Sequence, residues 1–121
     1  MKTIDHIALS VEDPEAAANW YIDNFCGKLL YCDDTWSFVQ FENIKMAFVK
    51  KGIHPAHFAF EVEGFSDEDV VKEHRDNSLS SYKRDPWGNV YELIKYPKKH
   101  WSSFFLTLLA GGVIICSRVY E

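Results

Sequence analysis

The 121-residue sequence is poor in cysteine, and its three cysteines form no CxxC pair. An odd number of scattered cysteines is typical neither of a disulfide scaffold nor of a thiolate zinc site. We therefore expect a protein of a reducing compartment. The first ten residues lack the apolar run of a secretory signal, so we predict a cytoplasmic location.

Basic residues are also scarce: 13 Lys and Arg stand against 18 Asp and Glu, a formal net charge of −5. Binding to a nucleic acid backbone depends on Lys and Arg that release counterions, so we expect no nucleic acid partner. The sequence has no phosphate-cradling glycine-rich loop, no dinucleotide-binding fingerprint, and no Ser or Cys nucleophile motif. The chemistries that these motifs serve are disfavoured.

Apolar material is sufficient for one globular domain, since 47% of the residues are hydrophobic and 16% are aromatic. The first half predicts a strand, a helix and three strands. Residues 3–11 alternate as in a strand, and Asp13 followed by Pro14 indicates a helix start. Apolar residues recur at helical spacing until Gly27 ends the helix: Ala17, Trp20, Tyr21 and Phe25. Short strands are expected at 28–33, 36–42 and 44–50.

The second half repeats this order in compressed form. Residues 56–62 alternate, and Ser66 opens an acid-rich turn that predicts a short helix ending near His74. Two strands, 79–84 and 89–95, flank the turn Asp85-Pro86-Trp87-Gly88. We expect a single domain over residues 1–98, with module 1 at about 1–51 and module 2 at about 52–98.

The two halves share sequence motifs that include a histidine. The segment His6-Ile7-Ala8-Leu9-Ser10-Val11 matches His57-Phe58-Ala59-Phe60-Glu61-Val62. The large apolar residues of each copy lie on the strand face opposite the histidine, so we expect both histidines to face a concavity. The later strands align Asn43-Ile44-Lys45-Met46 with Asn89-Val90-Tyr91-Glu92, which makes Met46 the expected equivalent of Glu92.

These residues predict a metal site. A single histidine in an apolar strand is usually a hydrogen-bonded core residue, but His6, His57 and Glu92 together supply two neutral nitrogen ligands and one anionic oxygen ligand. Burying Glu92 among apolar neighbours without a cation would cost several kcal/mol or raise its pKa. A divalent ion removes that cost.

The duplicated order, the two histidine motifs and the segment Asp85-Pro86-Trp87-Gly88-Asn89-Val90-Tyr91-Glu92 resemble the vicinal oxygen chelate superfamily of glyoxalases, bleomycin-resistance proteins, fosfomycin-resistance enzymes and extradiol dioxygenases. The resemblance implies an α+β fold in which two βαβββ modules form a cupped mixed sheet. It also implies one divalent ion (Fe, Mn, Zn or Ni), a small-molecule substrate and a homodimer. It leaves open whether one chain or a pair of chains completes each site.

One departure bears on the reaction. Glyoxalase I enzymes use a further glutamate ligand on the last strand of the first module, where this sequence has Met46, and a thioether is a poor ligand for a hard ion. We therefore predict a divalent-metal-dependent enzyme other than a typical glyoxalase I, with a lyase, isomerase, transferase or extradiol-type dioxygenase reaction. The alternative is a non-catalytic, ligand-sequestering protein of the bleomycin-resistance type.

His74 and Tyr82 are the expected catalytic residues. With the turn that follows, they resemble in part the extradiol signature, in which a His and a Tyr flank the substrate. Three cations are candidates for binding an anionic substrate, although each also fits a solvated loop or edge strand: Arg75, Arg84 and Lys95. Four apolar residues are candidates for a pocket wall or for core: Trp36, Phe38, Met46 and Phe48.

Residues 99–121 form an apolar tail outside both modules, and residues 101–117 carry no charge. A membrane span needs about 20 apolar residues, so the run is short. Three interpretations stay open: a membrane anchor with Lys98 and Lys99 on the cytoplasmic side, a segment that packs across a dimer or covers a sheet edge, and an accidental extension of the reading frame.

Overall fold

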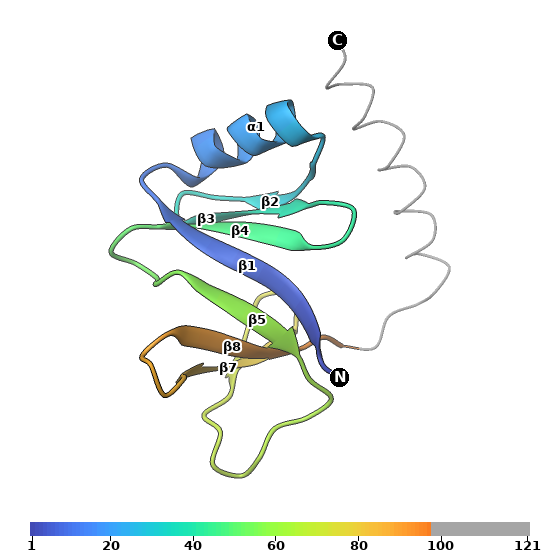
Figure 1. Cartoon of the computed structure of the whole chain (residues 1–121), viewed down its shortest axis with the longest axis vertical. Coiled ribbons are helices and arrows are strands. Elements are labelled where there is room, and N and C mark those ends of the chain that lie inside the picture. The colour runs from blue at the N-terminus through green and yellow to red at the C-terminus, as the bar shows by residue number, and fades with distance from the viewer. Residues whose placement is uncertain (98–121) are drawn as a thin grey trace.

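The computed structural model describes residues 1–97, which form one helix and eight strands (Figure 1). The elements are β1 (Thr3–Val11), α1 (Pro14–Phe25), β2 (Lys28–Cys32), β3 (Trp36–Gln40), β4 (Lys45–Lys50), β5 (His57–Glu61), β6 (Lys72–Glu73), β7 (Leu79–Arg84) and β8 (Val90–Lys95). Each expected strand is present, with ends that differ by at most two residues. The expected α+β class and the curled mixed sheet are confirmed.

The eight strands form one sheet in the order β2-β3-β4-β1-β5-β8-β7-β6. The first strands of the two modules, β1 and β5, pair antiparallel at the centre, and each has a parallel partner from its own module, β4 or β8. Both modules therefore follow the same pairing rule. The short strand β6 and the strand β2 are the two edges of the sheet.

Helix α1 covers the module 1 end of the sheet, over β2, β3 and β4 (Figure 1). The Asp13 side chain accepts a hydrogen bond from the Ala16 amide at 3.2 Å, as expected for an N-cap. The buried stripe contains Ala18 and Ile22, which pack with Val39 and Phe48. The expected stripe is thus partly wrong: Ala17 and Tyr21 pack against this core, whereas Trp20 and Phe25 are exposed.

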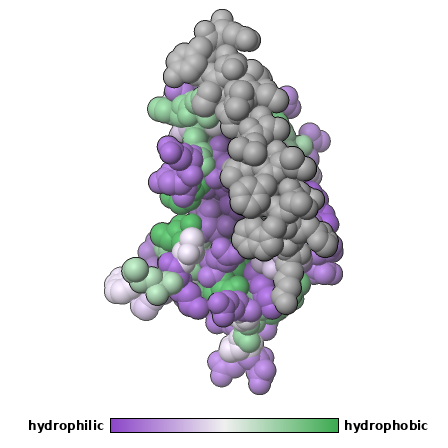
Figure 2. Space-filling model, turned by 90° about the vertical axis from the view of Figure 1, so that its right-hand side faces the viewer, coloured by the Kyte–Doolittle hydropathy of each residue, from purple (hydrophilic) through white to green (hydrophobic). Residues whose placement is uncertain are grey.

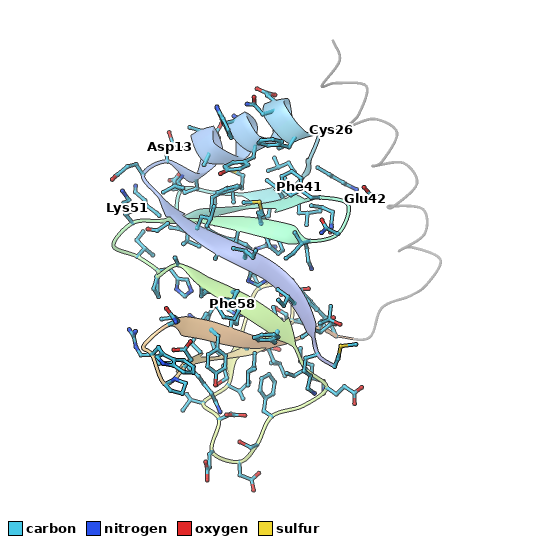
Figure 3. All side chains as sticks on the ribbon, in the orientation of Figure 1. Asp13, Cys26, Phe41, Glu42, Lys51 and Phe58 are labelled. Atoms are coloured by element: carbon cyan, nitrogen blue, oxygen red, sulfur yellow. The ribbon has the colours of Figure 1, made fainter. Side chains whose placement is uncertain are left out.

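Helix α1 ends at Phe25, and its C-cap is Cys26 in place of the expected Gly27; the φ of Cys26 is 60°, which is left-handed. Gly27 is required for a different reason. A Cβ atom there would lie 2.6 Å from Val39 Cγ1 and 3.0 Å from the Phe41 ring. Figure 3 shows Cys26 and Phe41 at the same end of α1, where the chain turns back under the helix. The glycine allows this close approach.

The helix expected between Ser66 and His74 is absent, and this prediction is wrong. The Ser66 amide donates to the Asp69 carboxylate at 2.8 Å, and the Asp69 amide donates back to the Ser66 carbonyl at 3.1 Å. The capping signal therefore forms a single turn. β-branched Val70 and Val71 follow, and a helical nucleus without continuing helix formers does not propagate. The chain instead enters β6.

Within the described part, residues 1–97, no helix is long and apolar enough to cross a membrane. The apolar run 101–117, on which the membrane interpretation depended, lies outside these residues. Figure 2 shows one side of the molecule, where hydrophilic residues predominate and hydrophobic side chains form small separate groups.

Candidate metal site

Three central strands place His6, His57 and Glu92 on the concave face of the sheet. In the antiparallel pair of β1 and β5, His6 lies opposite Ala59. His57 lies opposite Ala8 in the same pair, and β8 brings Glu92 beside Ala59. Paired residues on neighbouring strands point to the same face. The two buried alanines end at Cβ and leave room for the larger side chains.

The donor atoms of these three residues meet at one point. His6 Nε2 and His57 Nε2 each lie 3.1 Å from the same Glu92 oxygen, Oε1. One ligand atom from each residue lies within 4.8 Å of the others, and all three side chains are buried. The sequence left open whether one chain or two would be needed, and here a single chain brings all three residues together.

The hydrogen-bond partners of the two imidazoles show why this arrangement suits a cation. The carbonyl of Pro55, which only accepts, lies 3.0 Å from His57 Nδ1, and the Asp5 carboxylate lies 2.8 Å from His6 Nδ1. Each Nδ1 therefore carries a proton, and in neutral imidazoles the Nε2 lone pairs point at the Glu92 carboxylate. Acceptors that face one another repel, so either both imidazoles are protonated or a cation lies between them.

The two nitrogen–oxygen distances also fit ligands of one ion. Two donor atoms that are each about 2.1 Å from a metal are about 3.0 to 3.4 Å apart at coordination angles of roughly 90 to 110°. The measured nitrogen–oxygen distances of 3.1 Å lie in this range. Two imidazoles and a carboxylate are ligands of Zn²⁺, Fe²⁺, Mn²⁺ and Ni²⁺ alike.

The pKa values show the same electrostatic coupling without a metal. Burial alone would raise the pKa of Glu92, but the hydrogen bonds to His57 and His6 outweigh it and lower that pKa to about 2. Burial alone would lower the pKa of His6, and the hydrogen bonds to Asp5 and Glu92 raise it above its ordinary value. The site therefore holds a carboxylate that favours positive charge beside it.

Asp5 supports His6, although strand alternation placed these two residues on opposite faces. The pairing of β1 with β5 shifts register between Ile4 and His6, and this bulge turns the Asp5 side chain toward the site. Asp5 also accepts a hydrogen bond from the Tyr96 hydroxyl at 2.5 Å and pairs with Lys45 at 2.9 Å. Sequence reasoning missed Asp5 because no local pattern signals the bulge.

The strand register corrects one expected equivalence. The repeat alignment made Met46 the counterpart of Glu92. In the sheet, however, the residue beside Ala8 is Ala47, just as the residue beside Ala59 is Glu92. Met46 lies on the other face, against the α1 core, because a shift of one residue in a strand exchanges the faces. Alanine offers no ligand atom, so β4 supplies no further ligand here.

Both expected catalytic residues lie close to the three clustered side chains. Tyr82 packs edge-to-face on His57, with ring centroids 5.4 Å apart, and burial followed by the Glu92 charge raises the pKa of its phenol. His74 Nε2 lies 2.5 Å from the Ser80 hydroxyl and 3.9 Å from Glu92 Oε2. Their roles stay predictions.

Sequence reasoning did not select His54. Its ring lies 4.9 Å from the rings of His57 and of Tyr82, measured between centroids. Within residues 1–97, His54 Nε2 is a buried atom without a hydrogen-bond partner. Burial, with the neighbouring His57 charge, lowers the pKa of His54. The spacing of His54 and His57, three residues apart, was the available signal.

A cavity of about 350 Å³ opens over this cluster and is lined by residues of both modules. Of the four pocket candidates, Trp36 and Phe38 line the cavity, whereas Phe48 lies with Met46 in the core under α1. Of the three candidate cations, only Arg75 lines it. Arg84 donates to the Gly88 carbonyl in its own turn, and Lys95 is exposed.

The fold and the three-residue cluster define a class of cupped, two-module proteins with a candidate metal site at the centre of the sheet. A family model, the Glyoxalase/Bleomycin resistance protein/Dioxygenase superfamily, matches residues 3–101. The chain therefore belongs to this superfamily.

Three solved structures show the extent of the similarity. Methylmalonyl-CoA epimerase from Mycobacterium tuberculosis is 16% identical with a TM-score of 0.64, over 79% of this chain and 89% of that one. A hypothetical protein from Bacillus halodurans C-125 is 15% identical with a TM-score of 0.64, over 82% and 97%. A superfamily member from Vibrio splendidus 12B01 is 11% identical with a TM-score of 0.56, over 78% and 99%. No curated protein matches the sequence. At these identities the similarity shows the fold alone.

Proposed function

We propose that the protein is a divalent-metal-dependent enzyme that acts on a small substrate with two neighbouring metal-binding oxygens. His6, His57 and Glu92 are the proposed ligands of one ion, which is Fe, Mn, Zn or Ni. The observation that carries the proposal is the convergence of two imidazole nitrogens on one buried carboxylate oxygen, each at 3.1 Å. A divalent ion bound there would supply Lewis acidity to the substrate oxygens.

The surrounding residues are suited to proton transfer. The His54 imidazole lines the cavity and its pKa is lowered, so we propose it as the base that accepts a proton from a bound substrate. Tyr82 keeps its proton because its pKa is raised, so it can donate a hydrogen bond to a substrate oxygen. The hydroxyl of Ser80 holds the His74 ring in place.

A base and a hydroxyl donor beside one cavity favour an isomerase or lyase reaction among those expected. Epimerisation, which the names of several structural neighbours state, removes and returns a proton at one carbon. We propose proton transfer of this type for the site. We do not propose the substrate of those neighbours, because the property that they share with this chain is the fold.

Elemental analysis and metal titration test the proposal. The purified full chain is expected to bind one divalent ion per chain, and His57→Ala is expected to abolish this binding. His54→Ala is the matched control: it removes an imidazole beside the same cavity and should keep the ion. A wild-type protein that binds no divalent ion at micromolar concentration would refute the proposal.

A ligand-sequestering function of the bleomycin-resistance type is the second candidate. The observation in its favour is the aromatic wall of the cavity, which includes Trp36 and Phe38. Such a wall can hold a flat ligand without turnover. Tight ligand binding that persists in His57→Ala, with the metal removed, would favour this candidate over the enzyme.

The remaining proposals concern organisation and location. We propose a single domain over residues 1–98 and a homodimer, supported by the exposed Ile4 and Ile7 on the outer face of β1. Sedimentation of the full chain tests the dimer. We also propose a cytoplasmic location, and flotation with liposomes tests the alternative of membrane association through residues 101–117.

A further inference from the structure

The two edges of the sheet meet at residues that line the cavity. Strands β2 and β6 are at opposite ends of the strand order, yet Arg75, which follows β6, lies over the Tyr31 ring of β2. The guanidinium carbon is 3.6 Å from the centroid of that ring and 6.0 Å from the Trp36 ring. The curled sheet therefore closes here through a cation–π contact.

An aromatic wall runs from Arg75 to the proposed metal site. From Tyr31 the next ring is Trp36, with centroids 4.9 Å apart, followed by Phe38 at 5.4 Å. The Phe38 ring lies 5.4 Å from the ring of His6. All of these residues line the same cavity, of about 350 Å³. A cation at one end and the three clustered side chains at the other are thus joined by a continuous apolar surface.

The acidic residues near Arg75 have their own hydrogen-bond partners. Asp33 accepts hydrogen bonds from the Tyr31 hydroxyl and from the amides of Thr35 and Trp36, the amides at 2.8 and 3.0 Å. Asp76 accepts from the amide and the hydroxyl of Ser78, at 3.0 and 2.6 Å. Both carboxylates therefore stabilise their own loops through these hydrogen bonds.

Two basic residues that line the cavity, Arg75 and Lys72, differ from these carboxylates. In the described residues, neither Arg75 nor Lys72 takes part in an ion pair, and both line the cavity. A guanidinium has five N–H donors in a planar fork, which matches a carboxylate. Because Asp33 and Asp76 lie close by, a group with a single negative charge fits better than a dianion such as phosphate.

We infer that the substrate is a small carboxylate with an aromatic or otherwise flat part. Its carboxylate binds Arg75, and the flat part lies along Tyr31, Trp36 and Phe38. The inference rests on the proposed function for the other end of the substrate, where two neighbouring oxygens would bind the metal ion. The size of the cavity limits the ligand to a small molecule.

Calorimetry on the zinc-loaded full chain tests the inference with two probes, 3,4-dihydroxybenzoate and catechol. Both present the same pair of neighbouring oxygens, and only the first has a carboxylate. Zinc has no redox chemistry. We expect Arg75→Gln to weaken binding of 3,4-dihydroxybenzoate at least tenfold and to change catechol binding by less than twofold. Arg75→Lys should recover part of the loss, and Arg84→Gln, at a cation that does not line this cavity, should match wild type.

Two results would overturn the inference. Equal weakening of both probes by Arg75→Gln would show that Arg75 only holds the sheet edges together, and no weakening of either would show that it binds neither probe. Benzoate and benzyl alcohol, titrated against metal-free protein by NMR, separate this inference from the proposed function. If the protein binds no zinc, the proposed function fails. The role of Arg75 is still tested: metal-free protein should bind benzoate more tightly than benzyl alcohol, and Arg75→Gln should remove this preference.

Discussion

Replacing Asp5 with Asn should weaken metal binding while all three proposed ligands stay in place. Asp5 accepts the Nδ1 proton of His6 at 2.8 Å and thereby directs the Nε2 lone pair at Glu92. An asparagine has a similar shape, but it lacks the charge that makes the imidazole more basic, and its amide leaves Lys45 without its ion-pair partner. Loss of a residue that orients a metal ligand costs about 10- to 100-fold in affinity, or about 1.4 to 2.7 kcal/mol.

The measurement is a zinc titration of metal-free protein in competition with a chromophoric chelator. Glu12→Gln is the matched control, because it removes the same charge from an exposed ion pair with Lys51 and should leave zinc affinity unchanged. Tyr96→Phe removes one hydrogen-bond donor from Asp5 and keeps the carboxylate. Its effect is expected to lie between those of the other two variants.

The reasoning is refuted if Asp5→Asn folds normally and binds zinc within twofold of wild type. Circular dichroism and thermal melting establish normal folding. An equal loss of affinity in Glu12→Gln would also contradict it, since the effect would then come from total charge and not from the hydrogen bond to His6.

Three further predictions concern stability and pH. Zinc at 100 times its Kd should stabilise the wild type by about 2.7 kcal/mol and raise Tm by roughly 10 to 20 °C, and thermal melting with and without a chelator should show no such rise for His57→Ala. Zinc affinity should fall as pH falls, because the raised pKa of His6 means that protons compete with the ion at higher pH than at an ordinary histidine; affinity that is constant between pH 5 and 8 would contradict this. Gly27→Ala should lower the free energy of unfolding by about 1 to 3 kcal/mol, because its Cβ would meet Val39. Gly64→Ala is the control, since no atom lies within 4 Å of its Cβ, and it should change that free energy by less than about 0.5 kcal/mol. Urea unfolding measures both.

The strands and the helix could be predicted because their signals are local. Alternation in residues 3–11 needs only the apolar pattern of one strand, and the start of α1 needs only Asp13 and Pro14. The helix expected after Ser66 failed because the local signal covers a single turn, and the residues beyond it decide whether that turn continues.

The candidate site could be predicted in part. The pairing of His6 with His57 followed from the repeated motif, and Glu92 followed from a carboxylate at an apolar position. Asp5 and Ala47 could not be placed, because a bulge and a register shift of one residue change which face a side chain occupies. Neither the bulge nor the register shift can be recognised from the apolar pattern of a single strand.

The sequence by itself determined where α1 and seven of the strands lie along the chain, and which residue types are available for chemistry, since these depend on neighbours along the chain. Only the tertiary structure decided which side chains meet: two imidazoles on one carboxylate oxygen, and Arg75 on the ring of Tyr31 from the opposite edge of the sheet. The physical reason is that such contacts depend on the twist and curl of all eight strands together, and this curl is the sum of many weak interactions between segments far apart in the chain.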